Sequence, residues 1–149
     1  MWKKLINTNN DIAPLVLRLA LGIVFYFHGM QKLAAMYGGY GFTGTMGFFT
    51  EKLGIPALFA FLAIMAEGIG WVGLISGLLT RVAAFGITMN MIVAVYMLHW
   101  QNGIFMNWFG NQKGEGFEYH FLVLAIALVL IIKGGGWLSI DKWLSDKKN

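Results

Sequence analysis

The chain has 149 residues, of which 58% are hydrophobic and 12% are charged, and its net charge is +4. In a soluble domain of this length roughly a quarter of all residues are charged, so the low charge indicates a membrane protein. The length suits a single domain. The absence of cysteine excludes disulfides, thiolate nucleophiles, iron–sulfur clusters and Cys-ligated zinc.

Four hydrophobic segments follow one another along the chain, at about 12–36, 55–79, 81–100 and 117–134. Each is close to the roughly 20 residues that a helix needs to cross a hydrocarbon core about 30 Å thick. The first is not a signal peptide, because it exceeds an h-region of about 7–15 residues and contains Arg18, His28 and Lys32.

The sequence therefore predicts an all-α fold, an antiparallel bundle of four transmembrane helices within a single domain that covers residues 1–149. Pro56 suits the first turn of the second helix, where its missing N–H costs nothing. A tight turn at Thr80 and Arg81 joins the second and third helices into a hairpin. Only the polar tail from about Ser139 has the composition of a disordered segment.

The cations of the connecting segments predict the orientation of the chain. Seven lie on the side shared by both termini, namely Lys3, Lys4, Arg81, Lys133, Lys142, Lys147 and Lys148. Three lie on the other side, namely Lys32, Lys52 and Lys113. The positive-inside rule then places both termini in the cytoplasm of a multi-pass inner-membrane protein. Nucleic-acid binding is not expected, because these lysines lie beside hydrophobic runs and form no basic face.

Two segments on the opposite side are rich in glycine and aromatic residues: YGGYGFTGTMGFF at 37–49 and WQNGIFMNWFGNQKGEG at 100–116. They are either flexible connectors in the headgroup zone or a lid of aromatic rings over a site on the outer side. The sequence leaves both interpretations open.

Small residues recur at helical spacing on the second and third segments. One stripe comprises Ala63, Ala66, Gly70, Gly73 and Gly77, and the other comprises Ala83, Gly86, Asn90 and Ala94. Because lipid is as apolar as leucine, membrane helices associate through close contact and polar bonds. We interpret both stripes as packing seams rather than cofactor grooves.

Ionisable side chains inside these segments are the candidate functional residues, because a charge in mid-membrane is costly and usually faces the interior of a bundle. Glu67 is near the middle of its segment, Arg18 is near the cytoplasmic end, and the histidines share the outer half with Glu118. We predict acid–base roles for Glu67, Glu118 and His28, and cofactor-binding roles for Arg18, Lys32, His99 and His120.

Simple geometry limits this site. Arg18, His28 and Lys32 share one helix face, whereas Glu118 and His120 are about 200° apart, so at most one faces inward once the helix has begun. His99 falls opposite the stripe that contains Asn90. An alternative is that Arg18 and Glu67 form an ion pair that only fixes helix register. His and carboxylate groups suit zinc, copper or iron in type, but their spacing gives no dense signature, and we assign no metal ligand.

Several stretches in order resemble the DoxX family: LRLALGIVFYFHGMQKL (17–33), GGYGFTGTMGFF (38–49) with GIP (54–56), AEGIGWVGLISGLLTRVAA (66–84), and NGIF (102–105) with GFEYHFLVLAIALVL (116–130). The resemblance covers roughly residues 12–141. It implies a small four-helix membrane protein, and the family name comes from a membrane thiosulfate:quinone oxidoreductase. The positions that match the family pattern are Arg18, His28, Gly29, Lys32, Glu67, Thr80, Arg81, His99 and Glu118.

We therefore expect a membrane subunit of a redox system, in which Glu118 and His28 exchange protons with a quinone while Arg18 and Glu67 hold the bundle. Its partners would be the bilayer, a redox protein and further copies of the chain. A non-catalytic scaffold or binder of small lipids is the alternative from another class. Transport of a metal or small solute ranks last, because four short helices leave little room for a gated path.

Overall fold

The computed structural model describes residues 2–147, and every regular element in this range is helical. The α-helices are α1 (Trp2–Ile6), α2 (Ile12–Ala34), α3 (Gly41–Gly47), α4 (Ala57–Gly68), α5 (Gly70–Ser76), α6 (Thr80–Ala94), α7 (Glu118–Lys133) and α8 (Ile140–Asp146). Wider π-helical turns follow α3 at Phe48–Lys52 and α6 at Val95–His99, and a 3₁₀ turn occupies Trp100–Asn102. The predicted all-α fold is confirmed.

Three helical stretches of the described chain are long and apolar enough to cross a membrane: Ile12–Ala34, Ala57–Ser76 and Thr80–Asn102. The second is α4 continued by α5, with a break at Ile69 between two glycines. Helix α7 has 16 residues and spans about 24 Å at 1.5 Å per residue. It is thus shorter than the roughly 20 residues that a standard hydrocarbon core requires.

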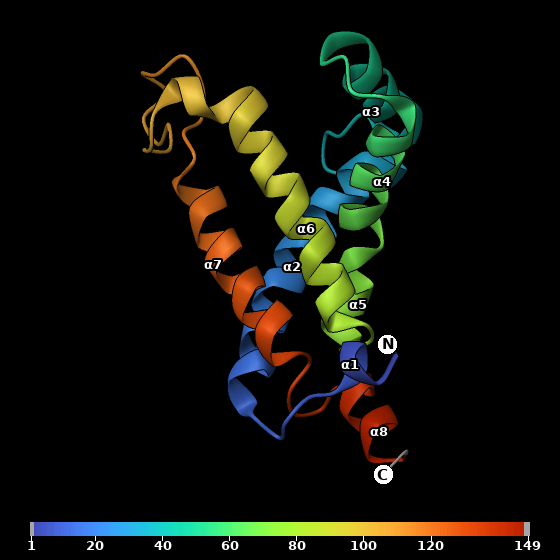
Figure 1. Cartoon of the computed structure of the whole chain (residues 1–149). Helices are drawn as coiled ribbons and strands as arrows, with labels where there is room; N and C mark the ends of the chain where they lie inside the picture. The colour runs from blue at the N-terminus through green and yellow to red at the C-terminus, as the bar shows by residue number, and fades with distance from the viewer. Residues whose placement is uncertain (1, 148–149) are drawn as a thin grey trace.

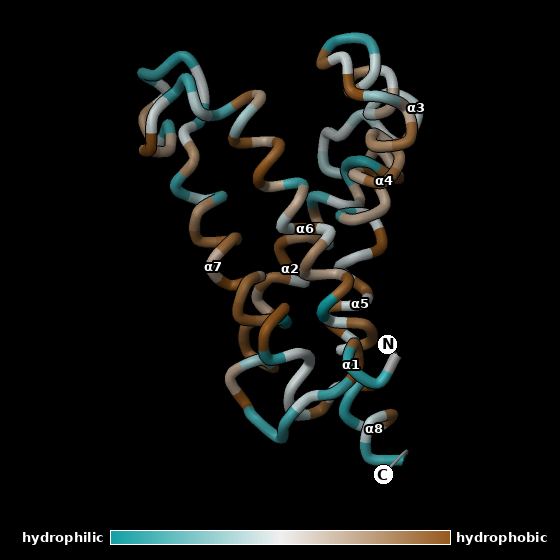
Figure 2. Tube along the Cα trace, viewed as in Figure 1, coloured by the Kyte–Doolittle hydropathy of each residue, from teal (hydrophilic) through white to brown (hydrophobic). Residues whose placement is uncertain are grey.

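The helices are arranged so that α1 and α8 lie at one end of the molecule, while α3 and the segment between α6 and α7 lie at the other (Figure 1). Helix α2 packs along α4 and α5, and α6 packs along α7. The outer surface along the helices is apolar, with exposed fractions of 65% for Leu58 and 66% for Phe121. Polar residues gather at the two ends (Figure 2), a distribution typical of a protein embedded in lipid.

The predicted stripes of small residues are packing seams. A Cβ added to Gly86 would lie 3.0 Å from the Cβ of Ala66, and one added to Gly73 would lie 3.2 Å from the Cβ of Ala83. These contacts join α4 and α5 to α6. On α2, a Cβ at Gly29 would lie 2.5 Å from the carbonyl oxygen of Glu67, so the α2 backbone reaches that of α4. Such approaches are how membrane helices gain packing energy.

Arg18 fastens the end of the molecule that holds α1 and α8. Its guanidinium is 1% exposed and donates to five backbone carbonyls, which belong to Leu74, Ile75, Gly135, Trp137 and Leu138. The first two are in the last turn of α5, where carbonyls have no partner within the helix. The other three are in the segment between α7 and α8. One side chain therefore caps a helix and holds a distant loop.

Asp141 on α8 caps the N-terminal end of α6. It is fully buried, and its carboxylate accepts hydrogen bonds from the backbone N–H groups of Leu79 and Thr80 at 2.8 and 2.9 Å. Free N–H groups at a helix start favour an anion. The expectation that the tail from about Ser139 is disordered is thus wrong for Ser139–Asp146, because its helix supplies this cap. The described residues end at 147, and the rest of the tail lies outside them.

The glycine-rich segment 37–49 is also more ordered than a flexible connector. It contains α3, and Thr45 on this helix is 4% exposed. Helix α3 packs against both α2 and α4. The connector interpretation is therefore wrong for this segment, whereas the segment after Asn102 has no regular element before Glu118.

Candidate functional site

The most deeply placed acid, Glu67 on α4, is bound from two neighbouring helices. Lys32 on α2 places its Nζ 2.6 Å from one carboxylate oxygen, and Asn90 on α6 donates to the other at 3.3 Å. The exposed side-chain fractions of Lys32 and Glu67 are 21% and 7%. Asn90 also donates to the carbonyl of Ala63 at 2.7 Å. A buried charge needs such a partner and such hydrogen bonds to be tolerated.

The considered pair between Arg18 and Glu67 does not form. The guanidinium of Arg18 donates to backbone carbonyls at the end of α5 and in the segment between α7 and α8, whereas Glu67 is paired with Lys32. Fourteen residues along a straight helix separate Arg18 from Lys32, which corresponds to about 21 Å. Arg18 is therefore a structural residue at the opposite end of the molecule, and the ion-pair partner of Glu67 is Lys32.

Contacts between aromatic rings connect the three histidines of the chain. The ring of His28 on α2 is 6.1 Å from the ring of Tyr119 on α7, and Tyr119 is 5.4 Å from His120. His99 lies 4.1 Å from His120, measured between ring centres. The charge of Glu67 acts on His28, Tyr119 and His120. We call the seven residues Lys32, Glu67, Asn90, His28, Tyr119, His120 and His99 the histidine–carboxylate cluster.

His99 joins the cluster because α6 does not continue with a constant angle per residue. The chain widens into a π-helical turn over Val95–His99, which changes the direction of the side chains that follow, and such turns are frequent at functional sites. The interpretation that placed His99 opposite the Asn90 stripe assumed 100° per residue throughout. Its Nδ1 lies 2.9 Å from the carbonyl oxygen of Glu115, so Nδ1 donates and the neutral ring keeps Nε2 as an acceptor.

Glu118 and His120 point to different surroundings, as expected for a helix that begins at Glu118. His120 is 7% exposed and faces the cluster. Glu118 accepts a hydrogen bond from Nε1 of Trp108 at 3.3 Å, in an exposed position. The structure therefore does not bring Glu118 together with His28 and Glu67.

Some polar atoms of this region are buried but have no hydrogen-bond partner within residues 2–147. They are Nδ1 of His120, the hydroxyl of Tyr119 and Nε1 of Trp71, besides the hydroxyl of Thr80 near the other end. Buried polar atoms are paired in the large majority of cases, so these three are free to bond a ligand. Sequence reasoning missed Tyr119 and Trp71, although Tyr119 stands between two predicted site residues. No group of three or more His, Asp or Glu side chains within the described range is arranged to hold a metal.

Comparison with known proteins gives a consistent result. The DoxX family profile matches residues 13–100. The chain is 29% identical to "Putative oxidoreductase CatD" of Bacillus subtilis, over 96% of each protein. It is 28% identical to the inner membrane protein YqjF of Escherichia coli, over 92% of the chain and 95% of YqjF. It is also 29% identical to the uncharacterized membrane protein Rv3486 of Mycobacterium tuberculosis, over 98% of the chain and 90% of Rv3486. No solved structure matches it significantly.

Proposed function

The chain belongs to the DoxX family, and from this premise we propose that it is an inner-membrane protein with four crossings whose histidine–carboxylate cluster binds a quinone head group. In this proposal α7 is the fourth crossing. A helix of 16 residues is accommodated by local thinning of the bilayer and by a flanking cation that extends its ammonium to the surface. Lys133, at the end of α7, is placed for this task.

Both termini are cytoplasmic in this arrangement. The end of the molecule with α1 and α8 (Figure 1) carries more of the described cations than the other end, among them the exposed Lys3 and Lys4. A cytoplasmic position for that end satisfies the positive-inside rule. The histidine–carboxylate cluster then lies in the half of the molecule that faces the outer side.

The observation that carries the quinone proposal is the set of unpaired buried polar atoms. The Tyr119 hydroxyl is a hydrogen-bond donor, and so is Nδ1 of His120 in the tautomer that carries its proton there. Both lack a partner in the described structure, and a quinone carbonyl oxygen only accepts. Aromatic rings border Tyr119 on one side, because the ring of His28 lies 6.1 Å from it and the ring of Phe25 lies 5.9 Å from His28. Polar groups set in an apolar wall are typical of a small-molecule site. Bound there, a quinone would supply electron and proton transfer.

The side chains of the cluster divide the remaining tasks. Lys32 and Asn90 hold the carboxylate of Glu67 in place from two neighbouring helices. His120 is in contact with His99, which reaches the outer segment through Glu115. The imidazoles of His99 and His120 can therefore relay protons between that segment and the buried residues. An exchange role for Glu118 stays a prediction, since it lies at the rim with Trp108.

These features support the proposal that the protein is the membrane subunit or accessory of a redox system, with a second redox protein as its partner. The name of CatD as an oxidoreductase supports this class. The scaffold alternative is favoured by a different observation, namely that Glu67 links α2, α4 and α6 through Lys32 and Asn90. In that alternative the cluster serves packing only.

The variant Tyr119→Phe separates the two functions, because it removes one hydroxyl and keeps the ring. Purified protein in detergent is titrated with a short-chain quinone while its tryptophan fluorescence is followed. One lost hydrogen bond of about 0.5–1.5 kcal/mol weakens binding about two- to tenfold. The melting temperature stays the same or rises, since a buried hydroxyl without a partner stabilises nothing. Tyr96→Phe, at a side chain that is 84% exposed, is the matched control.

The scaffold function is supported instead if the wild-type protein does not bind quinone. It is also supported if Tyr119→Phe lowers the melting temperature and leaves quinone binding unchanged. Either outcome removes the basis for a redox role at this cluster.

A further inference from the structure

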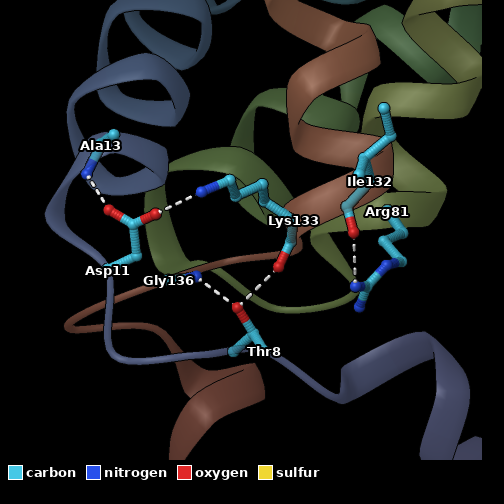
Figure 3. Close-up of polar contacts among 7 residues, drawn as sticks. All are labelled: Thr8, Asp11, Ala13, Arg81, Ile132, Lys133 and Gly136. Carbon is cyan, nitrogen blue, oxygen red and sulfur yellow. Dashed lines mark hydrogen bonds and ion pairs between the residues drawn. The ribbon is translucent and has the colours of Figure 1, made fainter.

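A cavity of about 260 Å³ lies at the opposite end of the molecule from the histidine–carboxylate cluster, where α2 begins and α7 ends. Its lining includes the side chains of Asn7, Asn9, Asp11, Arg81, Ile132 and Lys133. Figure 3 shows how Asp11 from the segment before α2, Arg81 from α6, and Ile132 and Lys133 from the end of α7 come together. We propose that this cavity binds a phosphate group, carried by the headgroup of an anionic phospholipid.

The first argument is an uncompensated charge. Arg81 donates to four backbone carbonyls, those of Leu5, Asn7, Ile131 and Ile132. These are neutral acceptors. The ion pairs that residues 2–147 form are Lys32 with Glu67, Lys133 with Asp11, and Lys142 with Asp146, so none of them includes Arg81. Among the described residues that line the cavity, the only carboxylate, Asp11, is paired with Lys133, so the guanidinium of Arg81 gives the cavity a net positive charge that attracts an anion from outside.

The second argument is that donors remain available on rigid supports. A guanidinium has five N–H donors, and the four contacts of Arg81 leave one free while they hold the group in place. Lys133 has three donors, of which the 2.7 Å contact with Asp11 uses one. Thr8, at 8% exposure, fixes the wall behind them, because it donates to the carbonyl of Lys133 and accepts from the N–H of Gly136 (Figure 3).

The third argument concerns the kind of molecule that carries the phosphate. The cavity lies where two membrane helices meet the water, since α2 begins at Ile12 and α7 ends at Lys133. Ile132 lines the cavity and is 66% exposed, and Ile12 and Val16 in the first turns of α2 are 61% and 60% exposed. A polar cavity bordered by lipid-facing side chains fits an amphiphile better than a free ion. Basic pockets between transmembrane helices at this depth bind anionic headgroups.

Two substitutions break the same ion pair but change the charge of the cavity in opposite directions. Lys133→Gln removes a cation, whereas Asp11→Asn removes an anion and keeps a residue that caps α2 equally well. Lys142→Gln, in an exposed pair at the same end of the molecule, is the control. Each protein, purified in neutral detergent, is titrated with dioleoyl phosphatidylglycerol or dioleoyl phosphatidylcholine, and bound lipid is counted by native mass spectrometry.

We expect about one phosphatidylglycerol per chain in preference to phosphatidylcholine. Lys133→Gln weakens this binding about fivefold and Asp11→Asn strengthens it about fivefold, as one unit charge near a membrane surface implies. Inorganic phosphate is the second arm. Inorganic phosphate could displace the lipid at millimolar concentration, with affinities that fall for Lys133→Gln and rise for Asp11→Asn. In that case the cavity is a phosphate site, but its natural ligand is a free anion and not a lipid headgroup. Equal binding of the two lipids, or a change in the same direction for both variants, overturns the proposal.

Discussion

The five carbonyl contacts of Arg18 allow a quantitative test of how this bundle is held together. The substitution Arg18→Lys keeps the charge but removes the planar fork. Lysine has three donors, so at least two of the five carbonyls lose their partner. A hydrogen bond to a charged group contributes about 1.5–3 kcal/mol. The free energy of unfolding should therefore fall by about 3–6 kcal/mol.

Arg81→Lys is the matched comparison, because Arg81 makes four such contacts and loses at least one. Its cost should be about half of that for Arg18→Lys, or about 1.5–3 kcal/mol. The reverse exchange at the exposed Lys113 should change nothing. The assay is reversible unfolding in lipid bicelles, with the melting temperature in detergent as a second measurement. If Arg18→Lys costs less than Arg81→Lys, the number of donors does not govern stability at this end of the molecule.

Two further predictions concern stability. The hydrogen bond from Lys133 holds the pKa of Asp11 below its ordinary value of 3.8, so the stabilisation that Asp11 provides is complete above pH 3.8 and is lost as the pH falls through the lower pKa of the folded state. We expect the melting temperature of the wild-type chain to fall faster than that of Asp11→Asn below about pH 4, and parallel curves would contradict this. Gly29→Ala should lower the free energy of unfolding by about 1–3 kcal/mol through overpacking, because its Cβ would lie 2.5 Å from the Glu67 carbonyl. Gly70→Ala, with its nearest contact at 3.8 Å, should be tolerated in the same unfolding assay, and equal costs would show that the close approach of α2 to α4 is not limiting.

Local patterns in the sequence predicted the helical elements and their packing surfaces well. Hydrophobic runs can be recognised from local composition alone, and three of the predicted runs form helices that are long and apolar enough to cross a membrane. The stripes that contain Gly73 and Gly86 were also identified correctly, because helical spacing determines which side chains share a face. The same spacing placed Arg18, His28 and Lys32 on one face, and each of them contacts other helices.

The sequence did not predict the partner of each polar group. Glu67 pairs with Lys32 and not with Arg18, because the partner depends on the height at which distant helices cross. Tyr119 was missed for a related reason, since an unpaired hydroxyl becomes visible only when its surroundings are known.

By itself, therefore, the sequence determined which segments are apolar helices and which of them contain ionisable groups, because hydrophobicity and the cost of exposing a charge to lipid are properties of each residue and its neighbours in the chain. Only the tertiary structure decided how those groups are joined. The π-helical turn at Val95–His99 brings His99 to His120, and Asp141 closes the start of α6. Both depend on where remote backbone segments end, which short-range patterns do not encode.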